Sequence, residues 1–307
     1  MINGKNPRVS VIITFLNEEE YLPESVESVI EQDFTDWELL LVDDGSTNNS
    51  TAIAKNYADR YPQKIFYIEH PGHINKGVCA SRNLGVEKAR GELIALFDAD
   101  DKWLPKKLSA QVALFDSNPN IGMLAEASLF WHSWQPEPLK KDIILQVGPE
   151  QNKTFEPPTL IPLIYPLGKT YAPCPSGLML KKSAILKAGG FEESFIKKYQ
   201  LYEDQAFLCK IYLQEKVYIS SDCNNLYRQR STSVMHWVHA DGQYHVVRRY
   251  FLDWLQQYLQ RNNITHKQVH AYLQKALRQY RYPKLYYLTN VLPKKVKNKV
   301  KRTLKQR

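Results

Sequence analysis

The chain has 307 residues, 43% of them hydrophobic, which is enough to bury one large core with or without a smaller appendage and excludes an intrinsically disordered protein. Its four cysteines are far apart and form no CxxC pair, so reduced thiols in a cytosolic protein are expected rather than a zinc site or a disulfide framework. The net charge is +9, but residues 254–307 contain 14 Lys and Arg and no acidic residue, whereas residues 1–253 carry a net charge of −5. This asymmetry argues against a nucleic-acid-binding core and indicates a basic appendage with its own partner.

The first 130 residues alternate between short apolar runs and segments in which apolar residues recur at helical spacing. Strands are predicted at residues 9–14, 37–42, 65–68 and 93–97. Helices are predicted between them, at residues 21–30, from about residue 51 and at residues 80–89. This alternation requires crossover connections and predicts an α/β fold with a mostly parallel sheet that helices cover on both faces. Ligands of such sheets bind at the carboxyl ends of the strands, so functional residues should follow Thr14, Val42 and Phe97.

The pattern changes after residue 130. Residues 131–169 are rich in proline and irregular, which predicts a long loop or a mobile flap. Short strands and one helix that begins near Glu203 are expected between residues 176 and 230. Beyond His236 apolar residues again recur at helical spacing and predict a helical extension.

Acidic residues gather where predicted strands end and where a predicted helix begins: Asp43-Asp44, Asp98-Ala99-Asp100-Asp101 and Glu203-Asp204. Side chains alternate along a strand, so the carboxylates of Asp98 and Asp100 should point to the same side and repel each other unless a cation lies between them. Mg²⁺ and Mn²⁺ bind one or two carboxylates together with substrate phosphate oxygens. The acids therefore predict a divalent metal site, and the alternative is an acidic turn that caps the following helix.

Several segments of the chain resemble one known family. The amino-terminal half of the inverting family 2 glycosyltransferases of GT-A fold is similar to VSVIITFLNEEEYLPESVESVIEQDFTDWELLLVDDGSTNNS. The segment that leads into the family's Asp-x-Asp motif is similar to ASRNLGVEKARGELIALFDADDKWLP, and its acceptor-side segments are similar to CPSGLMLKKSAILKAGGFEESF and YEDQAFL. The resemblance covers roughly residues 8–235. It implies a GT-A, Rossmann-like fold, a nucleotide-diphosphate sugar donor with UDP-sugars favoured, Mn²⁺ or Mg²⁺ as cofactor, and transfer with inversion to a hydroxyl of a glycan or lipid-linked acceptor.

The resemblance assigns donor-site roles by position. It places Thr14 in the base pocket and makes Asp44 the acceptor of a hydrogen bond from a pyrimidine ring N–H, since a carboxylate only accepts. Arg82 would contact the base or the phosphates, Asp98 would hold the ribose or a metal-bound water, and Asp100 would bind the metal directly. From the residues alone, Asp44 could instead be a turn residue and Arg82 could be solvated.

The Glu203-Asp204 pair is similar to the family's catalytic acids. Asp204 would be the general base, because an acceptor hydroxyl is a weak nucleophile that needs a carboxylate within hydrogen-bond reach. Glu203 would orient the site, and the metal would stabilise the departing diphosphate. As acids at a helix N-terminus, both would also be favoured by the helix dipole, which is compatible with catalysis.

Two positions depart from the family pattern. Leu16 stands where many relatives have an aromatic residue that stacks on the base. Arg230 stands where relatives commonly have the histidine of a Tyr-Arg-x-His motif. An arginine cannot ligate a metal, but it can hold a diphosphate through two hydrogen bonds, so Arg230 is expected in the donor site. His236 could supply the missing imidazole or could be a structural residue beside Trp237.

The resemblance also divides the chain into domains. A glycosyltransferase domain is expected at residues 1–235, with a donor-binding half at about 1–130 and an acceptor-side half at about 131–235. A basic helical extension follows at residues 236–307.

The end of that extension has an amphipathic pattern. Val296, Val300 and Leu304 recur four residues apart among lysines, which predicts a short basic helix that binds an anionic membrane surface; a solvated tail is the alternative. No apolar run reaches the roughly 18 residues that a spanning helix needs, and no signal peptide is apparent. We therefore expect a cytoplasmic enzyme, peripheral at the inner face of the plasma membrane, in cell-surface polysaccharide, lipopolysaccharide or other glycan synthesis.

Two other functions fit parts of the sequence. A sugar nucleotidyltransferase shares the fold and a paired-Asp metal site, but it would need a glycine-rich basic loop after the first strand, where residues 14–20 are acidic. A non-catalytic glycan- or nucleic-acid-binding protein would explain the basic tail. It would have no need for Asp98, Asp100 and Asp204 together.

Overall fold

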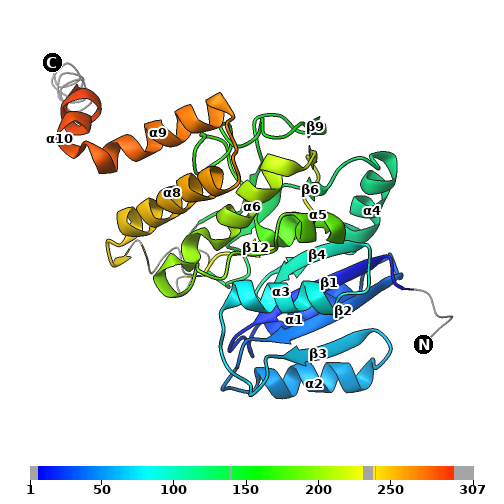
Figure 1. Cartoon of the computed structure of the whole chain (residues 1–307). Helices are drawn as coiled ribbons and strands as arrows, with labels where there is room; N and C mark the ends of the chain where they lie inside the picture. Colours follow the sequence, from blue (N-terminus) through cyan, green and yellow to red (C-terminus); the bar gives the residue numbers. More distant parts are fainter. Residues whose placement is uncertain (1–5, 138–139, 231–237, 239, 294–307) are drawn as a thin grey trace. The chain divides into compact units, whose positions relative to one another are not determined.

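The computed structural model describes residues 6–137, 140–230, 238 and 240–293. The chain forms two compact units, which meet in the sequence between Gln243 and Tyr244. The first unit is built on an eight-stranded sheet and a four-stranded sheet (Figure 1). His236 and the predicted amphipathic helix at residues 294–307 lie outside the described residues.

Parallel strands form most of the large sheet. Its amino-terminal half consists, in spatial order, of β3 (Ile65–Glu69), β2 (Trp37–Asp43), β1 (Val9–Phe15) and β4 (Leu93–Asp98). The sheet continues with β10 (Leu178–Lys181), β6 (Met123–Ala125), β11 (Val217–Ile219) and β9 (Lys153–Phe155). Of these eight strands, only β10 and β9 run antiparallel to their neighbours. The predicted α/β fold with a mostly parallel sheet is therefore confirmed.

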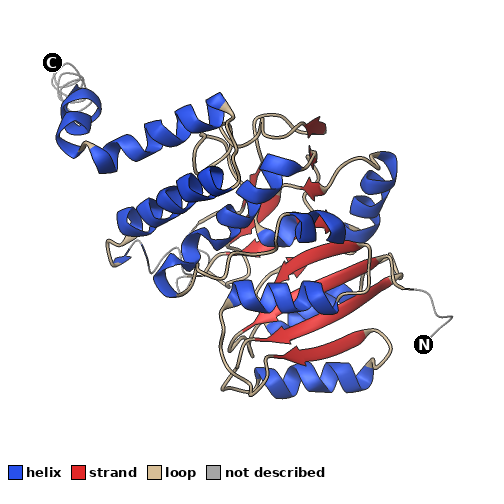
Figure 2. Cartoon of the chain, viewed as in Figure 1, coloured by secondary structure: helices blue, strands red, loops and turns tan. Residues whose placement is uncertain are grey.

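Helices cover both faces of the large sheet (Figure 2). The flanking helices are α1 (Leu22–Ile30), α2 (Ser50–Arg60), α3 (Val78–Lys88) and α4 (Lys107–Ser117). Alternate side chains of β1, from Val9 to Phe15, share one apolar core with α1, α2 and α4. On the opposite face α3 approaches closely, because a Cβ added to Gly85 would lie 2.6 Å from Cγ2 of Ile12.

The strand register aligns the carboxyl ends of the central strands. Phe15 at the end of β1 pairs with Asp43 at the end of β2, and Thr14 pairs with Asp98 at the end of β4. The residues that follow these strands therefore emerge at one edge of the sheet. This is the edge at which the sequence places the functional residues.

The region predicted as a long loop or flap contributes to both sheets. The small sheet has the order β5 (Lys102–Trp103), β12 (Asn225–Arg228), β7 (Ser128–Trp131) and β8 (Ile143–Leu145). Both β8 and β9 lie within residues 131–169, so the prediction of a free loop is wrong for these two stretches. Their backbone groups are satisfied by pairing with β7 and β11.

The part of the first unit after residue 131 also contains helical segments. These are η1 (Pro175–Gly177), α5 (Lys182–Lys187), η2 (Lys197–Tyr202) and α6 (Glu203–Gln214). The helix predicted near Glu203 is α6, whereas α5 was not predicted. The acid pair therefore lies in the first turn of a helix.

The described part of the second unit, residues 244–293, consists largely of helices. Its elements are α8 (Tyr244–Arg261), α9 (Lys267–Arg281), α10 (Pro283–Tyr286) and a π-helical segment, η3 (Tyr287–Val291). The helices α8 and α9 pack together, and Phe251 and Leu273 are among their fully buried side chains. Among the described residues, no helix is both long enough and apolar enough to cross a membrane.

Candidate active site

One pocket of about 730 Å³ opens at the carboxyl ends of β1, β2 and β4. It is lined by every residue to which the sequence assigns a donor-site, metal or catalytic role: Thr14, Asp44, Arg82, Asp98, Asp100, Glu203, Asp204 and Arg230. These residues come from strand ends, from α3, from the start of α6 and from the chain after β12. Leu16, Glu18, Lys76 and Lys197 also line the pocket.

Asp44 follows β2, and its carboxylate is held by donors from the first turn of α3 and from the two residues before that helix. Oδ1 accepts hydrogen bonds from the backbone N–H groups of Lys76 (2.8 Å) and Gly77 (3.0 Å) and from Oγ of Ser81 (3.0 Å). Oδ2 accepts from the N–H of Gly77 at 3.0 Å. A carboxylate oxygen has two lone pairs, so Oδ2 can accept a further hydrogen bond from a ligand.

Arg82 of α3 is buried and joins two acids. Its Nη1 donates to Oε1 of Glu203 at 2.6 Å and its Nη2 donates to Oδ1 of Asp98 at 2.8 Å. Only 5% of the Arg82 side chain is exposed, so the alternative of a solvated arginine is wrong. Burial raises the pKa of Glu203, and the Arg82 guanidinium opposes that rise. One cation therefore links the end of β4 to the acid pair of α6.

Arg230 joins two further acids. Its guanidinium donates to both carboxylate oxygens of Glu18 at 3.0 Å, and its Nη2 lies 2.6 Å from Oδ2 of Asp100. Burial raises the pKa of Asp100 to about 6; Arg230 opposes this rise, whereas Asp98 and Glu18 add to it. The sequence motifs alone do not single out Glu18, although its place in an acidic run shortly after the first strand is a signal that identifies it as a candidate.

Asp204 is held differently from its neighbour Glu203. The backbone N–H of Gln205 donates to Oδ1 of Asp204 at 2.6 Å, and the Gln205 side-chain amide donates to Oδ2 at 3.1 Å. The pKa of Asp204 is raised to about 7. Burial is the larger cause, and the nearby Glu203 carboxylate is the second. Asp204 can therefore exchange a proton near neutral pH.

Asp101 anchors the acidic turn after β4, a role that the sequence analysis missed. The carboxylate is fully buried and accepts hydrogen bonds from Oγ of Ser176 at 2.5 Å and from the backbone N–H of Arg228 at 2.9 Å. Oγ of Ser176 also accepts from the backbone N–H of Asp98 at 3.2 Å. Burial raises the pKa of Asp101 well above its usual range. These bonds fix the backbone that carries Asp98 and Asp100.

Comparison with known sequences identifies the family. The family model for glycosyl transferase family 2 matches residues 10–171, just over half of the chain. The chain belongs to this family. Over 114 residues it is 37% identical to TuaG of Bacillus subtilis (strain 168), which is provisionally named a teichuronic acid biosynthesis glycosyltransferase; the match covers 36% of this chain and 43% of TuaG. The chain spans less than half the length of several curated relatives that it matches.

Solved structures share the fold of this family 2 protein. TarS 1-349 of S. aureus, in complex with UDP-GlcNAc, is 20% identical, with a TM-score of 0.63 over 92% of this chain and 76% of that chain. The mannosyltransferase PcManGT of Pyrobaculum calidifontis, in complex with GDP-Man and Mn²⁺, is 16% identical, with a TM-score of 0.59 over 99% of this chain and 82% of that chain. At these identities the likeness establishes the fold alone.

The acids of the family 2 site fit a metal ion that is bound partly by protein carboxylates and partly by oxygen atoms of a substrate. Within the described part of the chain, no group of three or more His, Cys, Asp or Glu side chains is arranged to hold a metal ion. Asp98 and Asp100 line the pocket, and each places one carboxylate oxygen on an arginine. Mg²⁺ and Mn²⁺ need only one or two carboxylates when phosphate oxygens and water complete the octahedron. The donor set therefore fits a metal that binds with a nucleotide.

The pocket presents an aliphatic side chain at Leu16, the first of the two positions at which the sequence departs from the family pattern. Leu16 lines the pocket and is 40% exposed, whereas the ring of Phe15 is buried in the core beside α1. A bound base would therefore contact an aliphatic surface at this position.

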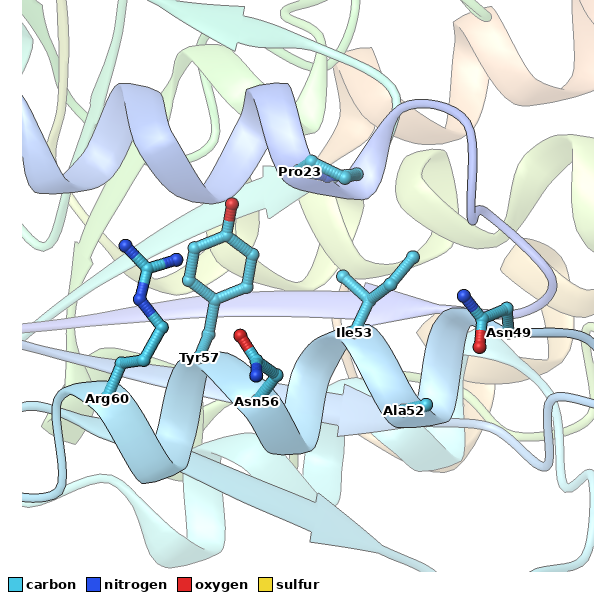
Figure 3. Close-up of a pocket in the computed structure, with 7 residues that line it drawn as sticks. All are labelled: Pro23, Asn49, Ala52, Ile53, Asn56, Tyr57 and Arg60. Carbon is cyan, nitrogen blue, oxygen red and sulfur yellow. The ribbon is translucent and has the colours of Figure 1, made fainter.

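A second, smaller pocket of about 350 Å³ lies between α1 and α2 (Figure 3). Its lining consists of Pro23, Asn49, Ala52, Ile53, Asn56, Tyr57 and Arg60. None of the residues with an assigned role lies there, and the hydroxyl of Tyr57 donates to Glu27 at 2.8 Å. The pocket at the strand ends is therefore the candidate active site of this family 2 protein.

Proposed function

We propose that this family 2 glycosyltransferase moves a sugar from a nucleotide-diphosphate donor, a UDP-sugar, onto an acceptor hydroxyl with inversion of the anomeric centre. The observation that carries the proposal is the convergence of three acidic segments on one pocket. They are Asp44, the Asp98 and Asp100 pair, and the Glu203-Asp204 pair. A binding module has no need for a carboxylate, that of Asp204, whose pKa is about 7. The loop after β1 carries Glu18 where a nucleotidyltransferase needs a basic phosphate loop.

Recognition of the donor base is assigned to Asp44 and Thr14. Oδ2 of Asp44 can accept one more hydrogen bond, and the ring N–H of uracil is a suitable donor. The UDP-GlcNAc complex of TarS supports a uridine nucleotide, whereas the GDP-Man complex of PcManGT shows that a protein of similar fold binds guanosine. The base is therefore the first property to test.

The metal role is assigned to Asp98 and Asp100. A bound Mn²⁺ or Mg²⁺ ion supplies Lewis acidity to the departing diphosphate. Arg82 and Arg230 hold the two carboxylates and offset their mutual repulsion. The guanidinium of Arg230 also has the geometry to bind a diphosphate through two N–H groups. The Mn²⁺ in the PcManGT complex supports this assignment.

Asp204 is assigned as the general base and Glu203 as the residue that orients it. Arg82 binds Glu203 through a 2.6 Å charge-assisted hydrogen bond that opposes the uptake of a proton, so Glu203 is less suited to act as the base. Asp204 is bound by the neutral groups of Gln205 and has a pKa of about 7. A base is most effective when its pKa lies near the working pH. With one base and direct displacement of the diphosphate, the transfer inverts the anomeric centre.

We assign the enzyme and its acceptor to a pathway of cell-surface glycan synthesis. The name of TuaG supports a polysaccharide pathway, and a glycan or lipid-linked acceptor fits a pathway at the cytoplasmic face of the plasma membrane. The basic residues of the C-terminal unit would hold the enzyme at the anionic lipid surface, each contributing about 1 kcal/mol near the membrane. Nucleic acid is not a proposed partner.

A donor panel tests the proposal. UDP-, GDP- and dTDP-sugars are each incubated with the protein in Mn²⁺ or in EDTA, and nucleotide release is measured. Release from a UDP-sugar in Mn²⁺ only, with loss of activity in Asp204→Asn, is expected. Release from GDP- or dTDP-sugars instead would overturn the base assignment, and failure of every donor to bind in calorimetry would overturn the transferase function.

A further inference from the structure

The segment after α9 exposes a row of apolar side chains. Tyr282, Leu285, Leu288 and Leu292 are spaced three, three and four residues apart, the spacing of residues on one side of a helix. Their exposed fractions are 61%, 46%, 58% and 40%. In the preceding helix α9, by contrast, leucines pack into a core, and Leu273 is fully buried. We call the four exposed residues the apolar stripe.

The charge around the apolar stripe has one sign. Arg281 ends α9 and Lys284 lies within the segment, and eight further Lys and Arg residues follow in the sequence between residues 294 and 307. No acidic residue occurs anywhere in residues 254–307. A second copy of the chain would bring the same positive charge to this face, and like charges in contact are unfavourable. A surface that is both negatively charged and apolar just beneath its charges is an anionic phospholipid bilayer.

The residue types also match the depth of a bilayer interface. Tyrosine has an apolar ring and a polar hydroxyl, and it is enriched where headgroups meet the hydrocarbon. Tyr282, Tyr286 and Tyr287 all fall in this segment, and Tyr287 is 44% exposed. The helical stretch from residue 283 to residue 293 is much shorter than the roughly 20 residues that a spanning helix needs. Such a segment can lie in the interface but cannot cross the membrane.

We propose that the apolar stripe inserts into the interface of an anionic phospholipid bilayer, while the basic residues that neighbour it in the sequence bind the lipid headgroups. The leucines would provide apolar contact, so binding would persist in part when salt screens the charges. The proposal deepens the proposed function, and it rests on that function only in the expectation that the acceptor is membrane-borne. Vesicle binding itself needs no donor, metal or acceptor.

The test compares two triple variants of the full chain. The stripe variant is Leu285→Gln, Leu288→Gln and Leu292→Gln. The matched control is Ile143→Gln, Ile144→Gln and Leu186→Gln, which removes three aliphatic side chains of the first unit that are 55%, 52% and 59% exposed. Both are mixed with vesicles of phosphatidylglycerol and phosphatidylcholine, in low and in high salt, and the bound fraction is measured by sedimentation. Thermal melting and UDP binding are measured for both variants as controls for folding.

The wild type and the control variant should bind the anionic vesicles, with partial binding left in high salt. The stripe variant should lose the salt-resistant part, with a partition coefficient about a hundredfold lower, because three half-immersed leucines no longer contribute. If the stripe variant bound the vesicles in high salt as well as the wild type does, the proposal would be overturned. It would also be overturned if light scattering without lipid showed an oligomer that only the stripe variant dissociates while vesicle binding stayed unchanged. A protein that binds vesicles through the stripe but releases no nucleotide would refute the proposed function and leave this inference intact.

Discussion

Replacing Glu18 with glutamine should strengthen the binding of UDP in the presence of Mn²⁺. The guanidinium of Arg230 donates to both carboxylate oxygens of Glu18 at 3.0 Å. A diphosphate that binds the same N–H groups must displace that carboxylate. Glutamine keeps the length of the side chain but lacks the charge, so it would compete less well for Arg230.

The size of the effect follows from the burial of the pair. The Arg230 and Glu18 side chains are 19% and 21% exposed. The pair therefore lies between an exposed ion pair, worth about 0.2–1 kcal/mol, and a buried hydrogen bond to a charged group, worth about 1.5–3 kcal/mol. An intermediate value of about 1–2 kcal/mol corresponds to a Kd for UDP that is about 5- to 30-fold lower. Arg230 would keep its contact with Asp100, so it would not become fully free.

Isothermal titration calorimetry of UDP in Mn²⁺ measures this change. Glu20→Gln is the matched control, because Glu20 is an exposed acid of the same loop that does not line the pocket. An equal gain in both variants would show a general effect of net charge and refute the reasoning. A gain from Glu18→Gln that persists in an Arg230→Gln background would show that Arg230 does not mediate it.

Three other outcomes are expected. Asp204→Asn should keep UDP and metal affinity but lower turnover by about 10²–10⁴, while Glu203→Gln should cost less; steady-state kinetics with the reverse order would assign the base to Glu203. Because the pKa of Asp204 is raised to about 7, the fraction of Asp204 in the proton-accepting form grows as the pH rises. We therefore expect kcat to increase by about tenfold per pH unit below 7 and to level off above it. A flat profile between about pH 5.5 and 8.5 would contradict this role. Asp100→Ala should abolish the difference in UDP affinity between Mn²⁺ and EDTA in calorimetry, and a difference of wild-type size would remove Asp100 from the metal site.

The sheet and the position of its site could be predicted because their signals are local. A run of buried apolar residues is itself the cause of a strand in a parallel sheet, and the predicted strands at 9–14 and 93–97 each end one residue before β1 and β4 do. Once the strand ends are known, the acids that follow them must emerge at one edge. The pocket at that edge contains every residue with an assigned role.

The charge pairing could not be predicted, because no local pattern encodes a partner that is distant in the sequence. Arg82 and Glu203 are 121 residues apart, and Arg230 and Glu18 are 212 residues apart. The sequence allows Arg82 to be solvated, and only the packing of α3 against the acid pair of α6 makes it a buried bridge. The same limit applies to β9, a three-residue strand whose hydrogen-bonding partner, β11, lies far along the chain.

The distribution of these counter-charges separates two kinds of acid in the pocket. Six acids line it: Glu18, Asp44, Asp98, Asp100, Glu203 and Asp204. Backbone N–H groups hold Asp44, and two arginines hold four of the others, so the negative charge of these five is opposed before any cation binds. Asp204 is instead bound by the neutral donors of Gln205. Its pKa is raised to about 7, above the value of about 6 for Asp100, whose rise Arg230 opposes. A carboxylate that binds a cation must stay ionised, whereas a general base must gain and lose a proton at the working pH. Asp204 is therefore our choice for the base, and a substitution that gave Asp204 an arginine partner should lower its pKa and shift the pH profile of kcat to lower pH.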